Sequence, residues 1–343
     1  MRRRTLLRSG LALGAGVAGA GIAAACSASP STVSNATPGP LETTTVRLAA
    51  GGPCDPAFWT AGDFLKEEGF TDYKVAANGI GAVAKGDADI GVGYSQWLIT
   101  NVDAGKNVVA LAGMHTGCAE LWTKPGIASI GDLRAKTIAV NSTDVTDTFY
   151  GFWAAILAYV GIDPRRDVNF VVYPAEVSTL DLFIQGQSDA ILALAASGPI
   201  LRASPKNTGR LLISMQDEAP WRQYYCCQLV ANRDWARKNP AAVKRATRAL
   251  LRANDRVAKD PAAGARAGFE QGLFGSTSYD ILMAVLRNCT FEWRDLDAQA
   301  SLRFFAVQLA DQKLVKGSPQ ELVTLASAYD YLQELRRQYP RAN

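Results

Sequence analysis

Thiol and imidazole side chains are the most reactive groups in this sequence. The chain has a single histidine, His115, and six cysteines. Apart from Cys26, which belongs to the N-terminal segment discussed below, these cysteines are Cys54, Cys118, Cys226, Cys227 and Cys289. Their number is odd, so at least one has no thiol partner. Thiolate and imidazole groups suit zinc or copper(I), and a Cys–His pair can form a nucleophile. The spacing matches no closed zinc motif built from paired C-x-x-C ligands.

Few catalytic motifs accompany these residues. One histidine excludes a multi-histidine metal site, and neither H-E-x-x-H nor G-x-S-x-G occurs. Residues 14–19 match the dinucleotide pattern G-x-G-x-x-G, but they lie in an apolar N-terminal segment, not between a strand and a helix. That match is spurious.

The elements that must position the reactive groups alternate along the chain. Expected strands cover 45–50, 90–94, 108–114, 137–141, 168–173 and 190–194. Expected helices cover 56–68, with Asp55 as N-cap, then 146–159 and 176–185. This alternation predicts an α/β fold with largely parallel sheets. From Pro240 onward the pattern is helical, over 241–259, 278–287, 297–312 and 319–337.

Ligands of open α/β sheets lie outside the carboxyl ends of the strands. This rule selects the loop that contains Cys54, and Tyr94 with Ser95 after the next apolar strand. Ser197 follows the strand at 190–194, in a segment without an acidic residue, which disfavours a strongly cationic ligand.

The start of the helix expected at 146–159 is a further candidate site. Ser142, Thr143 and Thr146 precede or open this helix, and free amides at a helix start can hold an anionic group. Alternatively, Thr143 or Thr146 only caps the helix. Tyr150 lies within the helix and is expected to contact the ligand.

The N-terminus has the features of an export signal. Arg2, Arg3 and Arg4 precede an apolar run over 11–25 that is too short to span a membrane. The arginine pair followed by leucines resembles a twin-arginine signal. Residues 23–26 (AAAC) resemble a lipobox, in which Cys26 carries the lipid, although Ala23 stands where Leu is commonest. Simple cleavage after the alanine run is the alternative. We expect a signal peptide at 1–25 and a flexible tether at 26–44.

Charge argues against a nucleic-acid partner. The formal net charge of the whole chain is +4, and the expected signal peptide holds four arginines and no acidic residue. The remaining chain is therefore neutral, without the basic footprint that nucleic-acid binding requires.

The order of these elements resembles one family closely. Residues 130–140 (IGDLRAKTIAV) and 229–240 (LVANRDWARKNP) resemble the taurine/sulfonate/nitrate class of ABC-transporter solute-binding proteins. The resemblance covers nearly the whole chain after the signal. The sequence is also similar to the thiamine-pyrimidine synthase branch, which shares this fold and carries His and clustered Cys near its site.

The resemblance implies a two-lobed periplasmic-binding-protein fold of type II, with ligand held between the lobes. We expect two hinge crossings, near 113–123 and 224–232. Lobe 1 then comprises 45–117 plus 233–343, and lobe 2 comprises 118–232. In this arrangement Tyr94, Ser95, Tyr150 and Tyr225 supply stacking and hydrogen bonds to the ligand.

The expected crossings bring His115 and Cys118 beside Cys226 and Cys227 at the cleft floor. Adjacent strand residues point to opposite faces, so Cys226 and Cys227 cannot both face the ligand. Three interpretations stay open. The thiols are simply buried, or Cys118 forms one disulfide with a neighbour. They contact an organic ligand. Or His115, Cys118 and one or both of Cys226 and Cys227 bind a soft metal.

The resemblance favours an extracytoplasmic, lipid-anchored monomer in the periplasm or on the outer face of the cell membrane. It would capture a small polar organic solute (a sulfonate, a nitrogenous compound or a pyrimidine-like molecule) for an ABC permease and ATPase, without a cofactor and without catalysis. The alternatives are an exported soft-metal or thiophilic-ligand binder, an enzyme like the pyrimidine-precursor synthases, and a sensory surface lipoprotein.

Overall fold

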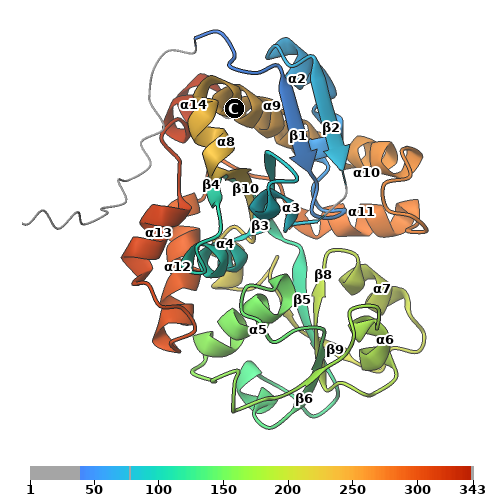
Figure 1. Ribbon diagram of the computed structural model, residues 1–343. Coiled ribbons are helices and arrows are strands. Elements are labelled where there is room, and N and C mark those ends of the chain that lie inside the picture. Colours follow the sequence, from blue (N-terminus) through green and yellow to red (C-terminus); the bar gives the residue numbers. More distant parts are fainter. Residues whose placement is uncertain (1–38, 77–78, 341–343) are drawn as a thin grey trace, which may run out of the picture. The chain divides into compact units, whose positions relative to one another are not determined.

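The computed structural model describes residues 39–76 and 79–340 (Figure 1). The expected signal peptide, Cys26 and most of the expected tether lie outside these residues. None of the helices in this described part has the length and the apolar character that a membrane crossing needs.

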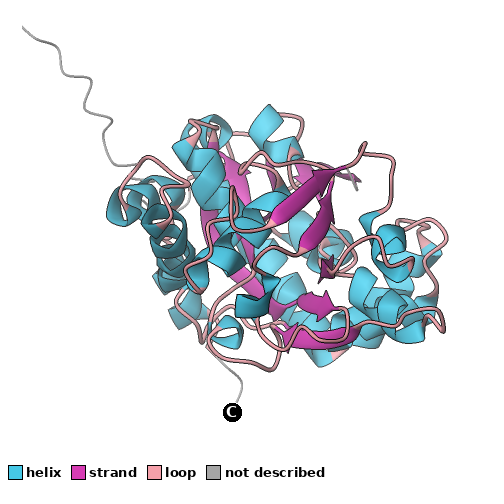
Figure 2. Ribbon diagram, turned by 90° about the horizontal axis from the view of Figure 1, so that it is seen from below, coloured by secondary structure: helices cyan, strands magenta, loops and turns pink. Residues whose placement is uncertain are grey.

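The larger sheet has six strands. In spatial order they are β11 (Cys289–Thr290), β4 (Val108–Gly117), β10 (Cys227–Asn232), β3 (Ile90–Tyr94), β1 (Thr45–Ala49) and β2 (Asp72–Ala76). β1 runs parallel to β2 and β3, whereas β10 runs antiparallel to β3 and β4. Every residue of β3 and β4 is buried, and Figure 2 shows the strands surrounded by helices.

Two smaller sheets lie within residues 119–214. In the three-stranded one, β5 (Ala119–Thr123) lies between β8 (Ala190–Leu194) and β9 (Arg210–Ser214) and is antiparallel to both. In the other, β6 (Thr137–Val140) runs parallel to β7 (Asn169–Val172). The α/β class is confirmed, but the expectation of largely parallel sheets is wrong. The strands that follow the two passages, β5 and β10, each run antiparallel to both of their neighbours.

The chain passes between the larger sheet and the β5 sheet twice. The first passage is at Gly117 and Cys118, whose φ angles are both positive, at 93° and 33°. A Cβ on Gly117 would lie 2.1 Å from the carbonyl oxygen of Asn288, so only glycine fits there. The second passage uses residues 215–226. The range expected from the sequence, 224–232, is too late because Cys227–Asn232 already pairs with β3 and β4.

Helices connect and cover the strands. Up to the end of β10 they are α1 (Ala57–Thr60), α2 (Gly62–Glu67), α3 (Ala82–Lys85), α4 (Ser95–Asp103), α5 (Thr148–Tyr159), α6 (Thr179–Ile184) and α7 (Ser197–Ala203), with single turns at Ile130–Leu133 and Trp221–Gln223. The later helices are α8 (Arg233–Lys238), α9 (Pro240–Lys259), α10 (Pro261–Glu270), α11 (Tyr279–Arg287), α12 (Ala298–Asp311), α13 (Pro319–Ala326) and α14 (Leu332–Gln338). The expected helix at 56–68 is interrupted at Ala61, and that at 319–337 is split into α13 and α14.

Helix α12 packs against α5 and so joins the C-terminal helices to the region of the smaller sheets. The ring of Phe304 on α12 lies 5.6 Å from that of Trp221 and 5.9 Å from that of Tyr159, between ring centroids. The guanidinium of Arg165 donates a hydrogen bond of 2.8 Å to the carbonyl oxygen of Gln312. The two parts of the chain therefore share one apolar core.

Candidate functional site

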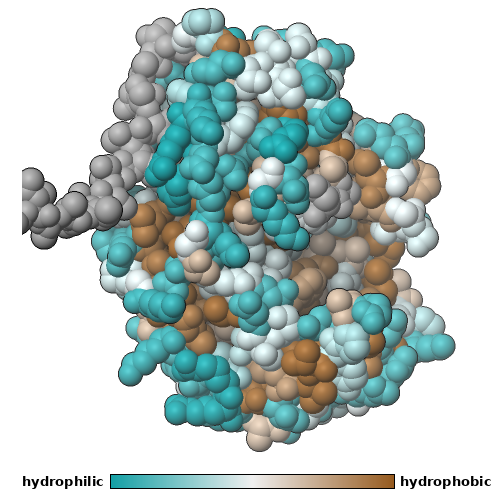
Figure 3. All heavy atoms as spheres, viewed as in Figure 1, coloured by the Kyte–Doolittle hydropathy of each residue, from teal (hydrophilic) through white to brown (hydrophobic). Residues whose placement is uncertain are grey.

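A cavity of about 370 Å³ is lined by residues of the larger sheet and the loops after β1 and β2 on one side, and by the end of β8, the residues after it and the start of α5 on the other. Figure 3 shows the surface hollowed where apolar, brown atoms gather. The lining residues are Gly51, Gly52, Pro53, Cys54, Asp55, Gly79, Ile80, Val92, Tyr94, Thr148, Phe149, Leu194, Ala195, Ala196 and Cys227. This volume suits a small organic molecule.

Strand ends of the larger sheet supply one wall of the cavity. Cys54 follows β1 and Tyr94 ends β3, and both line the cavity, as the rule of carboxyl strand ends led us to expect. Cys227 begins the antiparallel β10 and pairs with Tyr94. The start of one strand therefore reaches the same edge as the end of its neighbour.

Asp55 and His115 form a buried pair at this wall, with exposed fractions of 3% and 1%. Asp55 Oδ1 lies 3.3 Å from His115 Nε2, and Oδ2 accepts hydrogen bonds from the amides of Gly51 (3.1 Å) and Gly52 (3.0 Å). The expected role of Asp55 as a helix N-cap is wrong, because its carboxylate bonds backward to this loop. Burial raises the pKa of Asp55 to about 6, against the lowering effect of His115.

Four side chains converge beside the cavity: Cys54, His115, Cys118 and Cys227, here called the Cys–His tetrad. One sulfur or ring nitrogen from each lies within 4.8 Å of all the others, and all four residues are buried. The register that pairs Cys227 with His115 aligns β10 with β4 at this point. The tetrad is the group of described residues that could hold a soft metal.

Cys226, which the sequence offered as a possible metal ligand, is not one of the tetrad residues, and Cys54, which the sequence did not offer as one, is. The Sγ of Cys226 lies 3.0 Å from Cys118 Sγ and 3.7 Å from His115 Nδ1. Cys227 lines the cavity and Cys226 does not, although the sulfur atoms of both lie close to that of Cys118, at 3.8 and 3.0 Å. The five cysteines of the described residues are free and buried.

Cys226 and His115 shift each other's pKa values. Burial alone would raise the pKa of the Cys226 thiol, but hydrogen bonds with Cys118 and Cys227 and the charge of His115 lower it well below its ordinary value. Burial would lower the pKa of His115, but the nearby thiols, Cys226 first, and Asp55 raise it well above its ordinary value. The polarised thiol is thus one that does not line the cavity.

At the opposite wall, Asp147 caps α5, which begins at Thr148 rather than at residue 146. Asp147 Oδ1 accepts hydrogen bonds from the amides of Phe149 (3.0 Å) and Tyr150 (2.9 Å). The expectation that Thr143 or Thr146 caps this helix is therefore wrong.

The loop before α5 satisfies its own polar groups. Asp144 Oδ1 accepts the amide and the hydroxyl of Thr146, both at 2.9 Å, and Ser142 Oγ accepts the amide of Asp144 at 3.0 Å. Thr143 is exposed. None of Ser142, Thr143 and Thr146 lines the cavity, and an anion at this helix start would meet the carboxylate of Asp147.

Phe149, not Tyr150, lines the cavity from α5. Phe149 is 48% exposed, whereas Tyr150 is 4% exposed and packs edge-on against Phe170 at 5.2 Å between centroids. Successive helix residues point about 100° apart, so one of the two faces the cavity and the other the core. Phe149 was not expected as a lining residue, because the periodic pattern alone does not show which side of the first turn faces the cavity. Asp147, a favoured N-cap residue, was the available signal.

Ser95, Tyr225 and Ser197 do not line the cavity. Ser95 is fully buried and donates a 2.6 Å hydrogen bond to the carbonyl oxygen of Tyr225. The amide of Tyr225 donates to Ser301 Oγ on α12 at 3.0 Å. These contacts join α4 and α12 to the segment that precedes β10. Ser197 begins α7 and is half-buried, one residue beyond the lining residue Ala196.

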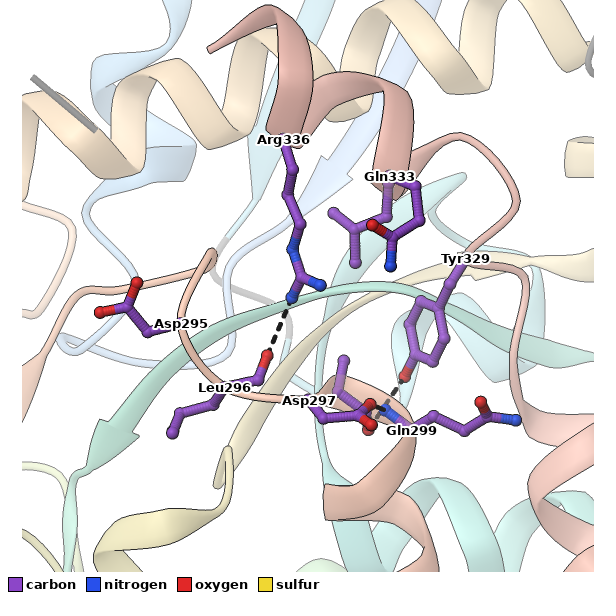
Figure 4. A pocket seen from close by; sticks show the side chains of 9 residues that line it. Asp295, Leu296, Asp297, Gln299, Tyr329, Gln333 and Arg336 are labelled. Carbon is purple, nitrogen blue, oxygen red and sulfur yellow. Dashed lines mark hydrogen bonds between the residues drawn. The ribbon is translucent and has the colours of Figure 1, made fainter. Parts of the chain in front are cut away.

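A second pocket, of about 260 Å³, lies where α12 and α14 meet (Figure 4). Arg336 points to the loop before α12 and donates a 2.8 Å hydrogen bond to the carbonyl oxygen of Leu296. The hydroxyl of Tyr329 donates to Gln228 Oε1 at 3.0 Å. Both side chains are engaged in joining elements, so we assign no ligand to this pocket.

Comparisons with known proteins agree with this architecture. The family model described as "NMT1/THI5 like" matches residues 65–264. A comparison with curated protein sequences gives no match.

Solved structures share the fold at low sequence identity. The alkanesulfonate-binding protein SsuA from Xanthomonas axonopodis pv. citri, bound to MOPS, is 16% identical, with a TM-score of 0.64 over 84% of this chain and 99% of that one. The periplasmic nitrate-binding protein NrtA from Synechocystis PCC 6803 is 13% identical, with a TM-score of 0.66 over 88% and 90%. A cysteine-to-serine mutant of DszB, in complex with biphenyl-2-sulfinic acid, is 14% identical, with a TM-score of 0.58 over 86% and 99%.

The two sheets joined by two passages, the helical C-terminal region and the similarity to SsuA and NrtA confirm the two-lobed periplasmic-binding-protein fold expected from the sequence. The family model spans more than half of the chain. The chain therefore belongs to the NMT1/THI5-like family.

Proposed function

We propose that this protein is the extracytoplasmic solute-binding component of an ABC importer. The observation that carries the proposal is the 370 Å³ cavity, because residues of both sheet regions line it. A cavity shared by two lobes can bury a small ligand when the lobes close on it. Similarity in fold to sulfonate- and nitrate-binding proteins supports the same role.

The lining favours an uncharged ligand with an apolar or aromatic face. Ile80, Val92, Phe149 and Leu194 supply apolar surface, and Tyr94 supplies a ring with a hydroxyl group. None of the described lining residues is Lys or Arg, so a sulfonate would lack a basic partner. Of the solutes that the sequence suggested, a nitrogenous or pyrimidine-like molecule fits this lining better than a sulfonate.

The sequence supports a location outside the cytoplasm and attachment to a membrane. The signal-like segment at 1–25 supports export, and Cys26 with the tether at 26–44 supports attachment to the outer face of a membrane. The sequence suggested 45–117 plus 233–343 as lobe 1 and 118–232 as lobe 2; we assign residues 227–232 to lobe 1 instead, because β10 pairs with β3 and β4. An ABC permease and ATPase would take the solute from the closed monomer.

The test is a thermal unfolding screen with pyrimidines, other nitrogenous heterocycles and sulfonates. A ligand at 100 times its dissociation constant should add about 2.7 kcal/mol to the free energy of unfolding. For a compound that binds, Phe149→Ala should weaken affinity about fivefold, because an aromatic contact in a pocket contributes about 1 kcal/mol. Phe269→Ala is the matched control, since Phe269 is 50% exposed and lies outside the cavity. Equal affinity in both variants would refute binding in this cavity.

An enzymatic function is less well supported, although Cys54, His115 and Asp55 lie together and DszB shares the fold. Hydrogen bonding with Cys118 and burial raise the pKa of Cys54, one of the two cysteines that line the cavity. A raised pKa removes the thiolate that a nucleophilic cysteine needs. Recovery of the bound compound unchanged after long incubation would support a binder, and conversion would support an enzyme.

A further inference from the structure

We propose that the Cys–His tetrad (Cys54, His115, Cys118 and Cys227) binds a thiophilic d¹⁰ metal ion, zinc(II) or copper(I), at the wall of the cavity. The proposal goes beyond solute capture, because an ion held by four protein side chains needs no organic solute. The tetrad draws on separate parts of the chain: the loop after β1 (Cys54), the end of β4 (His115), the first passage between the sheets (Cys118) and the start of β10 (Cys227).

The separations suit a small tetrahedral site. Cys118 Sγ lies 3.8 Å from Cys227 Sγ. Two sulfur atoms at about 2.3 Å from a tetrahedral zinc ion are themselves about 3.8 Å apart. All four ligand atoms lie within 4.8 Å of one another, so small side-chain rotations would complete the coordination shell. Each residue is buried, which excludes competing water.

The backbone is arranged to bring His115 and Cys118 together. Residues three apart on a regular strand point to opposite faces. The positive φ angles of Gly117 and Cys118 interrupt this alternation between β4 and β5. A positive φ angle is unfavourable for cysteine, and such strain is typical of functional sites. Here its result is a thiol beside the histidine.

Asp55 is placed to orient the His115 ring, as carboxylates commonly do for histidines that bind a metal. Its carboxylate lies 3.3 Å from His115 Nε2 and is itself held by the amides of Gly51 and Gly52. A histidine that binds metal through one ring nitrogen usually donates its other N–H group to a carboxylate or carbonyl oxygen. The ring orientation is thus set before an ion arrives.

The ligand types select the ion. Three thiols and one imidazole are a common zinc set and also suit copper(I), whereas calcium and magnesium require oxygen ligands. Cys54 and Cys227 line the cavity, so an ion could reach the tetrad through it.

The experiment uses the full chain, reduced and freed of metal, titrated with zinc(II) or copper(I) against a chromophoric chelator. One equivalent should bind per chain. Cys54→Ser and Cys227→Ser should each weaken binding more than about 100-fold, and Asp55→Asn about 10- to 100-fold. Cys289→Ser is the matched control, because Cys289 is also a free, buried cysteine but lies outside the tetrad. Its affinity should fall by less than about tenfold, because all four tetrad side chains remain and only the contact of Cys289 with His115 changes.

Two results would overturn the proposal. Equal affinities for Cys54→Ser and Cys289→Ser would mean that the ion binds elsewhere. X-ray absorption of the loaded wild-type chain that finds oxygen ligands without sulfur would also refute the proposal. This measurement does not depend on whether the variants fold. Phe149→Ala should bind metal normally, so failure of the metal site and failure of solute binding can be told apart.

Discussion

The two walls of the cavity use their polar groups in opposite ways. At the wall formed by the larger sheet, sulfur atoms and the His115–Asp55 pair are buried, and two of the cysteines face the cavity. At the wall formed by α5, the Asp147 and Asp144 carboxylates accept hydrogen bonds from their own loop. The sheet wall therefore retains groups that can bind a ligand, whereas the polar groups of the α5 wall mainly stabilise their own local fold.

This difference explains why similar sequence signals had different outcomes. Ser and Thr residues before a helix occur in ligand sites and in ordinary helix caps, and here the chain supplies its own carboxylate. Buried cysteines have few polar partners of their own, so their position at a cavity is more informative about ligands.

The largest expected effect is at the sheet wall, from Gly117→Ala. The added Cβ would meet the carbonyl oxygen of Asn288, at a positive φ angle. We expect a loss of about 3 kcal/mol in the free energy of unfolding, together with loss of zinc binding, because Cys118 would move. Gly161→Ala is the control: its φ is 72°, but no atom lies within 4 Å of the added Cβ. It should cost about 1 kcal/mol. Chemical denaturation measures both, and equal losses would contradict the close approach at Gly117.

A smaller effect is expected at the α5 wall. Asp147→Ala leaves two amides of the first turn without their partner and should cost about 1 kcal/mol. Thr143→Ala should change the free energy of unfolding by less than about 0.5 kcal/mol, because Thr143 is exposed. Metal binding should stay normal in both variants. A loss of metal in Asp147→Ala would mean that the two walls are not independent.

The smallest effect concerns the stability of the protein at low pH. It depends on Asp163, which follows the C-terminal end of α5. Hydrogen bonds from the Arg165 side chain lower the pKa of Asp163 to about 2, against the effect of burial. An unfolded chain has an Asp pKa of about 3.9. The ionised carboxylate therefore stabilises the fold above about pH 4, and this contribution is lost as the pH falls toward 2.

Asp163→Asn should lower stability near neutral pH and flatten its dependence on pH between about 4 and 2. Urea denaturation at several pH values measures this dependence. Unchanged profiles in the variant would show that the Asp163–Arg165 pair contributes nothing to stability.

Much of the fold could be predicted from the sequence because apolar runs define the buried strands. The strand at 90–94 and the helices after Pro240 follow directly from such patterns. The direction of β10 could not be predicted in the same way. It depends on where the chain crosses between sheets, and the second crossing is an irregular segment without a periodic signal.

The candidate site was predictable only in part. Cys54 and Tyr94 follow from the rule of strand ends. The sequence suggested Tyr150 as a ligand contact, whereas its neighbour Phe149 lines the cavity. An error of one residue along a helix moves the side chain to another face. Cys118 reaches the tetrad through positive φ angles at a passage between sheets, and strand periodicity gives no indication of that geometry.

The packing of α12 on α5 has a consequence for how the protein is made. During synthesis α5 leaves the ribosome long before α12, so Trp221 and Tyr159 must wait for Phe304 before their contacts are complete. Arg165 must wait in the same way for the carbonyl oxygen of Gln312. A chain that stopped before residue 298 would expose these apolar rings to proteases and chaperones instead of forming a smaller stable protein.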